Sequence, residues 1–264
     1  MVPGVLRGHA RSSGGSGPRP SGRPPVEAEA SLPRLLQPYL PSDHARQVNG
    51  SYYVEQLMRA EPPPKKVMDL GCGRGDSVDM FRGLDPTVEW IGVDVGTSIE
   101  VAQRERTDAR FVTYDGQALP FDDASFDLVY SRQVLEHVRE PLAHLAEIKR
   151  VLRRGGVFTG STSQFEPYHS RSYWNFTIFG FVELVTESGL EVRELRPGID
   201  GVTLLVRSYL GRPPGFGQWF EVDSPLNEEI DVWGQSGPRT IQQVNLRKLQ
   251  YAGQFVFDVR RPAR

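Results

Sequence analysis

Three aspartates each close a strand-like segment, and their surroundings suit a nucleoside site. Asp69 runs into 71–75, a turn with glycine at every second position, where the backbone can approach a ligand closely. The acid before this turn repels a pyrophosphate and suits a cationic ligand. Asp94 can accept hydrogen bonds from both hydroxyls of a ribose, and Asp115 can accept one from an adenine amino group. The residues therefore predict a site for an adenosine compound that carries positive charge.

An alternation of strand-like and helix-like segments positions these aspartates. Short β-rich runs separated by helical segments indicate parallel βαβ units. We expect strands at 66–70, 90–95, 110–114, 127–131, 157–161, 190–195 and 254–259, and helices at 45–60, 76–84, 97–106, 141–152 and 172–188. Open α/β sheets bind ligands at the carboxyl ends of their parallel strands, so the three carboxylates should meet at one edge.

Two regions lie outside this alternation. The excursion between the last two strands is too long for a hairpin, so we expect an inserted cap at about 197–250 with one or two helices, the clearest at 239–249. Residues 1–25 contain six Gly, five Pro and four Ser and no acidic residue, a composition that cannot offset its ordering entropy. We therefore expect a disordered tail and linker over 1–44 and one domain over 45–264.

Composition excludes several classes of protein. The 31 basic and 33 acidic residues leave a formal charge of −2, which disfavours a nucleic-acid partner. The single cysteine, Cys72, cannot form an internal disulfide, which fits a reducing compartment. No apolar run approaches the roughly 20 residues that span a bilayer, and no signal-type stretch precedes the domain. We expect a cytoplasmic protein without a membrane span. A transit peptide and a homodimer are alternatives that stay open.

The motifs resemble those of the class I S-adenosylmethionine-dependent methyltransferases over about 65–196. The segments that carry the resemblance, in the family's order, are 69–75, 126–130, 135–138 and 150–156. The resemblance implies an α/β, Rossmann-like, doubly wound sheet of seven strands in the order 3-2-1-4-5-7-6, with the last strand antiparallel. The cofactor-binding residues that it implies are Asp69, Gly71, Gly73, Asp94, Asp115, Gly116, Gln117 and Ser131.

The family assigns a part of the cofactor to each of these positions. Asp69 and Gly71 would lie along the methionine moiety, and Ser131 would present its backbone carbonyl to the methionine amino group. Asp94 would hold the ribose. Asp115, together with its glutamine neighbour, would flank the adenine. The implied cofactor is S-adenosylmethionine.

Methyl transfer from a sulfonium to a hydroxyl needs alignment and a base. His137 and Glu136, after the fourth strand, are our catalytic candidates, with His137 as the base because imidazole suits proton transfer near neutral pH. These two residues could instead pack or cap a helix start, and His144 and His169 are further candidates. The segment is similar to the E-x-x-E-H run by which some ubiquinone-pathway O-methyltransferases bind a divalent cation. Gln133 replaces the first acid, which weakens such a site, so magnesium stays open.

Two further segments, 168–177 and 245–255, are similar to stretches of methyltransferases of bacterial polysaccharide and glycan synthesis. The likeness implies a sugar or polysaccharide-precursor hydroxyl as acceptor. The expected substrate contacts are Tyr168, His169, Arg171 and Tyr173. The alternatives are a methyltransferase of a small phenol, quinone or other natural product, and a non-catalytic S-adenosylmethionine-binding subunit. An NAD-dependent dehydrogenase is disfavoured, because it predicts a G-x-G-x-x-G turn that the chain lacks.

Overall fold

The computed structural model describes residues 31–167 and 170–264. The chain divides into Met1–Ser31 and Leu32–Arg264, and every element given below belongs to the second unit. Two of the expected substrate contacts, Tyr168 and His169, lie outside the described residues.

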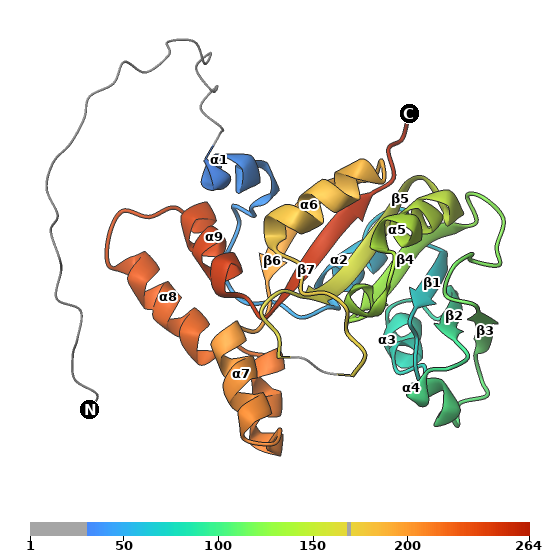
Figure 1. The fold of residues 1–264 in the computed structure, drawn as a ribbon. Coiled ribbons are helices and arrows are strands. Elements are labelled where there is room, and N and C mark those ends of the chain that lie inside the picture. The colour runs from blue at the N-terminus through green and yellow to red at the C-terminus, as the bar shows by residue number, and fades with distance from the viewer. Residues whose placement is uncertain (1–30, 168–169) are drawn as a thin grey trace, which may run out of the picture. The chain divides into compact units, whose positions relative to one another are not determined.

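Seven strands of the described chain form one sheet in the order β3-β2-β1-β4-β5-β7-β6 (Figure 1). The strands β1 to β5 are parallel, whereas β7 runs antiparallel to both β5 and β6. This arrangement confirms the predicted order and the antiparallel last strand. The strand bounds are β1 Lys66–Leu70, β2 Glu89–Val95, β3 Arg110–Tyr114, β4 Phe126–Arg132, β5 Leu152–Ser163, β6 Glu191–Pro197 and β7 Gln254–Arg260.

Helices cover both faces of this sheet. Successive residues of a strand point to opposite faces, so neighbouring residues pack against different helices. Met68 and Val129 are buried with α5 and α6, whereas Val67 and Leu128 are buried with α2 and α3. The helix bounds are α1 Leu32–Leu36, α2 Tyr52–Met58, α3 Ser77–Leu84, α4 Ile99–Ala102, α5 Pro141–Val151, α6 Ile178–Glu187, α7 Gly201–Tyr209, α8 Pro225–Gln235 and α9 Ile241–Tyr251, and the 3-10 helices are η1 Gln37–Tyr39, η2 Leu135–His137 and η3 Pro214–Phe220. None of these helices is long and apolar enough to cross a bilayer.

Three helices are shorter than the sequence pattern predicts. Thr177 caps α6 by accepting a hydrogen bond from the Gly180 amide, so this helix begins six residues later than the predicted 172. Ser98 caps α4 through the Val101 amide, and that helix ends at Ala102. The expected helix 45–60 starts only at Tyr52, the first residue of α2.

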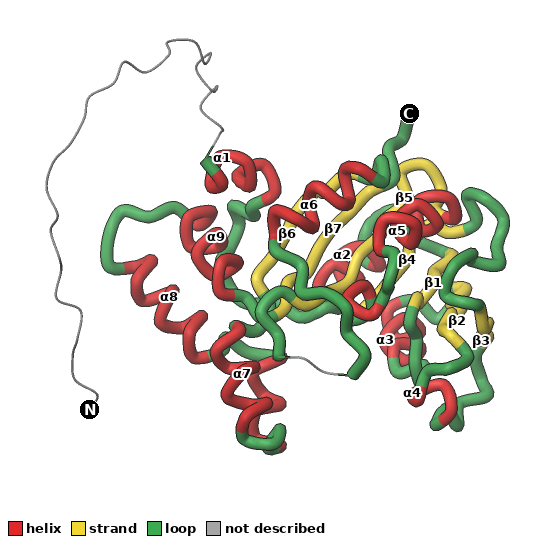
Figure 2. The backbone as a smooth tube through the Cα atoms, in the orientation of Figure 1, coloured by secondary structure: helices red, strands yellow, loops and turns green. Residues whose placement is uncertain are grey.

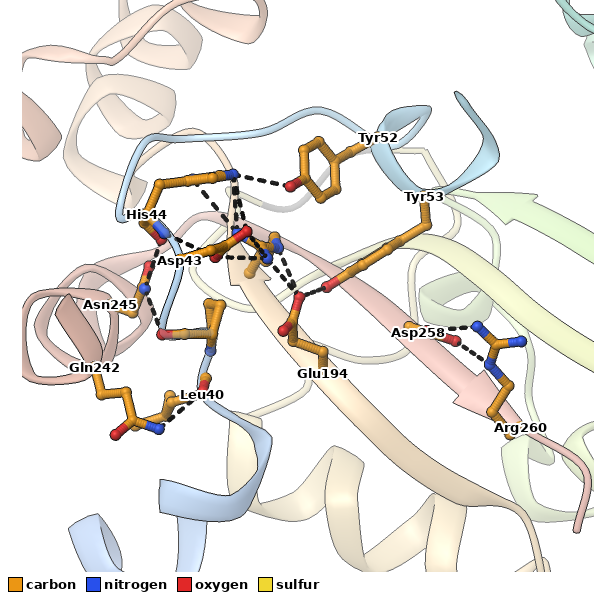
Figure 3. A network of polar contacts seen from close by, with 12 residues as sticks. Leu40, Asp43, His44, Tyr52, Tyr53, Glu194, Gln242, Asn245, Asp258 and Arg260 are labelled. Carbon is orange, nitrogen blue, oxygen red and sulfur yellow. Dashed lines mark hydrogen bonds and ion pairs between the residues drawn. The ribbon is translucent and has the colours of Figure 1, made fainter. Parts of the chain in front are cut away.

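The late start of α2 has a long-range cause. Asp43 stands just before the expected helix start at 45 and could have capped it, but it instead accepts hydrogen bonds from the buried Arg196 of β6 at 2.9 and 3.0 Å. Glu194 accepts from the same guanidinium and from the Tyr53 hydroxyl, both at 2.7 Å. Figure 3 shows Asp43, His44 and Glu194 gathered in this network. The residues before α2 are thus extended along β6 rather than helical.

The insertion between β6 and β7 contains three α-helices and a 3-10 helix, where we expected one or two helices. Figure 2 shows α7, α8 and α9 grouped next to the β6–β7 end of the sheet. Within α9, the fully buried Lys248 ammonium lies 3.0 Å from Asp223 and 2.7 Å from Asp231. This charged contact fixes α9 against α8 and the turn before it.

The segment 40–49 fastens the insertion to the rest of the unit. The buried Gln47 side chain accepts hydrogen bonds from Ser224 and Asn227 at 2.8 and 2.6 Å. Asn245 of α9 donates to the backbone carbonyls of Pro41 and His44. α1 and η1 lie within the range 1–44 that we expected to be tail and linker, and both are helical. Side chains of the insertion hold the segment 40–49, which begins in that range.

Candidate functional site

Asp69 lies at the carboxyl end of β1 and is buried. Its carboxylate accepts a hydrogen bond from the Ser77 hydroxyl, at the first residue of α3. Burial raises the pKa of Asp69 to about 7, the charges of Asp94 and Asp76 act in the same direction, and the bond from Ser77 opposes them. A cation placed beside this carboxyl would therefore stabilise its ionised form.

The glycine turn after β1 has no room for side chains. Gly71 and Gly73 have φ values of 80° and 50°, which only glycine adopts readily. A Cβ on Gly71 would lie 2.2 Å from a methyl group of Val134, so the turn touches the loop after β4. The turn therefore requires glycine, whose lack of a side chain allows a backbone to approach a ligand closely.

Two charged side chains hold the turn in place. Asp94 accepts a hydrogen bond from the Gly73 amide at 2.8 Å, and Arg104 donates to the Gly73 carbonyl at 2.8 Å. The Arg104 guanidinium also lies 3.9 Å from the centre of the Phe111 ring. The sequence analysis missed Arg104, because nothing in its local pattern distinguishes it from other basic residues after α4.

The structure brings the second and third aspartates to the same edge as the first. Burial raises the pKa of Asp94, which also accepts from the Val95 amide at 2.7 Å. Asp115 is exposed, and one of its oxygens accepts from the Gln117 amide at 2.8 Å. Burial raises the pKa of Tyr114 to about 12, and the charges of both Asp94 and Asp115 contribute. The edge thus has a buried, a half-buried and an exposed carboxylate in succession.

Ser131 ends the buried part of β4, next to β5. It pairs with Gly160, and a Cβ at that position would lie 1.6 Å from the Ser131 carbonyl oxygen. A side chain at position 160 would displace the Ser131 carbonyl from its position between β4 and β5. The predicted contact to a cofactor amino group concerns this same backbone oxygen.

Glu136 is fully buried in η2 and is held on both sides. Its carboxylate accepts from the Thr162 hydroxyl at 2.9 Å and from the Ser163 hydroxyl at 3.1 Å. Its backbone carbonyl accepts from the amides of Tyr173 and Trp174 at 2.7 and 3.2 Å. Burial raises the pKa of Glu136. The residue therefore joins η2, the end of β5 and the loop before α6.

His137 follows directly and is half-buried. Its charge helps to lower the pKa of Glu100, after the hydrogen bonds that Glu100 accepts. The side chain of Glu100 in turn lies 3.2 Å from the position of a Cβ on Gly73. His137 lies three residues after Val134, in the loop that touches the glycine turn at Gly71. His144, in contrast, is buried in α5, where burial lowers its pKa to about 4.

Gln133 and Glu166 extend the polar cluster around Glu136, and the sequence analysis did not assign Glu166 to it. In the amide orientation that satisfies its neighbours, Gln133 donates to Glu136 at 2.8 Å and to Glu166 at 3.1 Å. Its oxygen accepts from the Ser161 hydroxyl at 3.1 Å. Residues 31–167 and 170–264 contain no group of three His, Cys, Asp or Glu side chains that could hold a metal ion. An amide nitrogen thus occupies the place between carboxylates where a cation would be needed.

Arg171 and Tyr173, the two other expected substrate contacts, are exposed in the loop before α6. A cavity of about 540 Å³ lies elsewhere, beside the Asp43–Arg196 network, and includes Tyr53 and Asp258 in its wall. None of the strand-end aspartates lines it, and its acidic and basic side chains largely pair with one another. We therefore place the candidate site at the aspartate edge and not in this cavity.

Part of the chain is similar to known methyltransferases. Residues 68–159 match a family model described as a methyltransferase domain. A probable S-adenosylmethionine-dependent methyltransferase of Mycolicibacterium smegmatis is 31% identical over 142 residues, which cover 49% of this chain and 53% of that protein. A demethylmenaquinone methyltransferase of Thermotoga maritima is 27% identical over 166 residues, which cover 50% of this chain and 72% of that protein.

The likeness extends to the fold. An S-adenosylmethionine dependent methyltransferase from Mesorhizobium loti has a TM-score of 0.50 at 16% identity, over 80% of this chain and 97% of that one. The chain spans about half the length of the first curated relatives that it matches. The match to a methyltransferase domain thus covers residues 68–159, and the sheet as a whole has the fold of the Mesorhizobium loti structure.

Proposed function

We propose that the chain transfers a methyl group from S-adenosylmethionine to a hydroxyl group of a small acceptor. The observation that carries the proposal is the row of three carboxylates, Asp69, Asp94 and Asp115, along one sheet edge around a glycine turn. When bound, the cofactor supplies an activated methyl group on a positively charged sulfur. The cationic charge offsets the cost of ionising the buried Asp69.

The other proposed cofactor contacts follow the order of the strands along the sheet edge. Asp94 binds the ribose hydroxyls, and the exposed Asp115 with Gln117 binds the adenine. The Ser131 carbonyl accepts from the methionine amino group, which leaves the acceptor to enter beyond β4. The described residues do not fit a divalent cation, because the Gln133 amide already donates to both nearby carboxylates.

His137 is the proposed base. It lies in the loop after β4, whose Val134 touches the glycine turn at Gly71, and there we expect an acceptor hydroxyl to meet the methyl group. Glu136 then acts as a positioning residue, because both its carboxylate and its carbonyl are engaged by neighbouring elements. It holds η2, and with it His137, against the end of β5.

The acceptor that we favour is a hydroxyl of a sugar or polysaccharide precursor. Arg171 and Tyr173, exposed in the loop before α6, offer hydrogen-bond donors and an aromatic face to such a ring. A phenol or quinone is the second candidate, which the demethylmenaquinone methyltransferase among the relatives supports.

Calorimetric titration with S-adenosylhomocysteine tests the cofactor half of the proposal. We expect saturable binding that Asp94→Ala weakens at least about tenfold, because a charged hydrogen-bond acceptor is lost. The same substitution at the exposed Asp122 leaves the affinity unchanged. No saturable heat for the wild type, or equal affinities for all three proteins, would refute the assignment of the edge.

A labelled methyl donor tests the chemical half. Sugar, phenol and quinol acceptors are compared, each with magnesium and with a chelator. His137→Gln should lower turnover by about 100-fold or more and leave S-adenosylhomocysteine affinity within about twofold, since a base acts on the reacting proton only. Full turnover of this variant would show that another group takes the proton.

A further inference from the structure

The helix α7 turns an apolar stripe toward solvent. Val202, Leu205, Val206 and Tyr209 recur at the spacing of one helix face, and they are 53%, 50%, 42% and 90% exposed. The opposite face of α7 is also apolar in part, since Leu204 is buried against Gly253. A continuous exposed stripe of this kind marks an interaction surface, unlike apolar side chains scattered singly.

The segment that carries this stripe is basic up to Phe220, and Glu221 follows it directly. Residues 201–220, which span α7 and η3, contain Arg207 and Arg212 and no acidic residue, so their formal charge is +2 in a chain of −2. Arg212 is exposed just beyond the helix, and Arg207 lies over the Phe220 ring at 5.4 Å. The combination of apolar stripe and positive charge fits an anionic and partly apolar surface.

The stripe begins beside the end of β5, which the proposed function places on the acceptor side of the site. A Cβ on Gly201, the first residue of α7, would lie 2.7 Å from the Phe165 side chain, which is exposed two residues after the end of β5. The fully buried Asp200 caps α7 through the Thr203 amide at 2.7 Å, which fixes the direction of the helix. Figure 1 shows α7 running outward from the loop after β5.

We propose that residues 201–220 dock on an anionic phospholipid bilayer and thereby present the acceptor side of the site to a lipid-borne acceptor. The apolar stripe enters the boundary between headgroups and acyl chains, and Arg212 contacts headgroup phosphates. The docking itself is independent of the chemistry at the sheet edge. The lipid-borne acceptor rests on the proposed methyltransferase function.

Cosedimentation of the full chain with vesicles tests the docking. We expect binding to phosphatidylcholine vesicles that contain phosphatidylglycerol, and at least about tenfold weaker partitioning for Leu205→Glu. Arg212→Asn, which keeps a residue tolerant of its positive φ, should weaken partitioning about fivefold on anionic vesicles and not on neutral ones. Val232→Glu is the matched control, because Val232 is 67% exposed on α8 among Glu228, Glu229 and Asp231.

Three results would overturn the docking proposal. They are no binding of the wild type to anionic vesicles, equal weakening by Val232→Glu, and a dimer in analytical ultracentrifugation that Leu205→Glu dissociates. Equal melting temperatures establish that the variants are folded. Titration with S-adenosylhomocysteine in the absence of vesicles separates the proposals, since failed docking leaves that binding intact and failed cofactor binding leaves vesicle partitioning intact.

Discussion

The Ser77 hydroxyl connects Asp69 to Trp90. It donates to the Asp69 carboxylate and accepts from the Trp90 indole nitrogen at 3.0 Å. Trp90 is the second residue of β2, so this one hydroxyl joins the end of β1, the start of α3 and the neighbouring strand. The ionisation of Asp69 therefore depends on the packing of two elements beyond its own strand.

Ser77→Ala removes this shared partner. We expect the pKa of Asp69 to rise further, because the bond that opposes the effect of burial is lost. The free energy of unfolding should fall by about 2 kcal/mol, since the indole N–H is also left without its acceptor. Urea denaturation gives the stability, and carboxyl NMR gives the pKa. Ser236→Ala on the exposed end of α8 is the control.

Asp69→Asn should change how stability depends on pH. Burial raises the pKa of Asp69 from 3.8 to about 7, so its contribution to stability is complete below pH 3.8 and is lost as the pH rises through 7. Relative to the wild type, the variant should gain stability over this range by up to about 4 kcal/mol. Denaturation at pH 4 and pH 8 measures the difference. A gap between the two proteins that does not change with pH contradicts the assignment.

His144→Leu should act in the opposite direction. Burial lowers the pKa of His144 from 6.5 to about 4, so its contribution is complete above pH 6.5 and is lost as the pH falls through 4. Between pH 7 and pH 4, the free energy of unfolding should fall less in the variant than in the wild type, by up to about 3 kcal/mol. The two denaturation series, plotted as a difference, check this prediction, and parallel curves count against it.

Lys248→Met should loosen the insertion. The ammonium is fully buried, and its removal leaves Asp223 and Asp231 without their common cation, at a cost of about 3 kcal/mol. Lys65→Met breaks an ion pair of similar length with Asp85, but Lys65 is exposed, so that change should cost under about 1 kcal/mol. Thermal unfolding of both variants makes the comparison. Equal losses would show that burial does not matter here.

The strands and the aspartate edge could be predicted because their signals are local, whereas the strand order was implied by the resemblance to a known family. Apolar runs, turn glycines and the acids at strand ends stand next to one another in the chain. The start of α2 could not be predicted, since Asp43 is withdrawn from capping by Arg196, which lies 153 positions away. The placement of Arg104 against the Gly73 carbonyl likewise depends on a contact across the turn.

The insertion was underestimated for a different physical reason. Sequence periodicity identifies a helix by one apolar face and one polar face. α7 has such a contrast, but Leu205 and Val206 are exposed whereas Leu204 is buried, so the pattern does not show which apolar residues pack against the domain.

The long-range contacts of Gln47 bear on the order in which parts of the chain fold. Its partners Trp219 and Asn227 follow it by 172 and 180 positions, among the longest sequence separations of any described side-chain contact. During synthesis, the segment from β1 to β4, which contains Asp69, Asp94 and Asp115, leaves the ribosome before the insertion does. We expect the segment with the three aspartates to fold first and the contacts between Gln47 and the insertion to form in a later step.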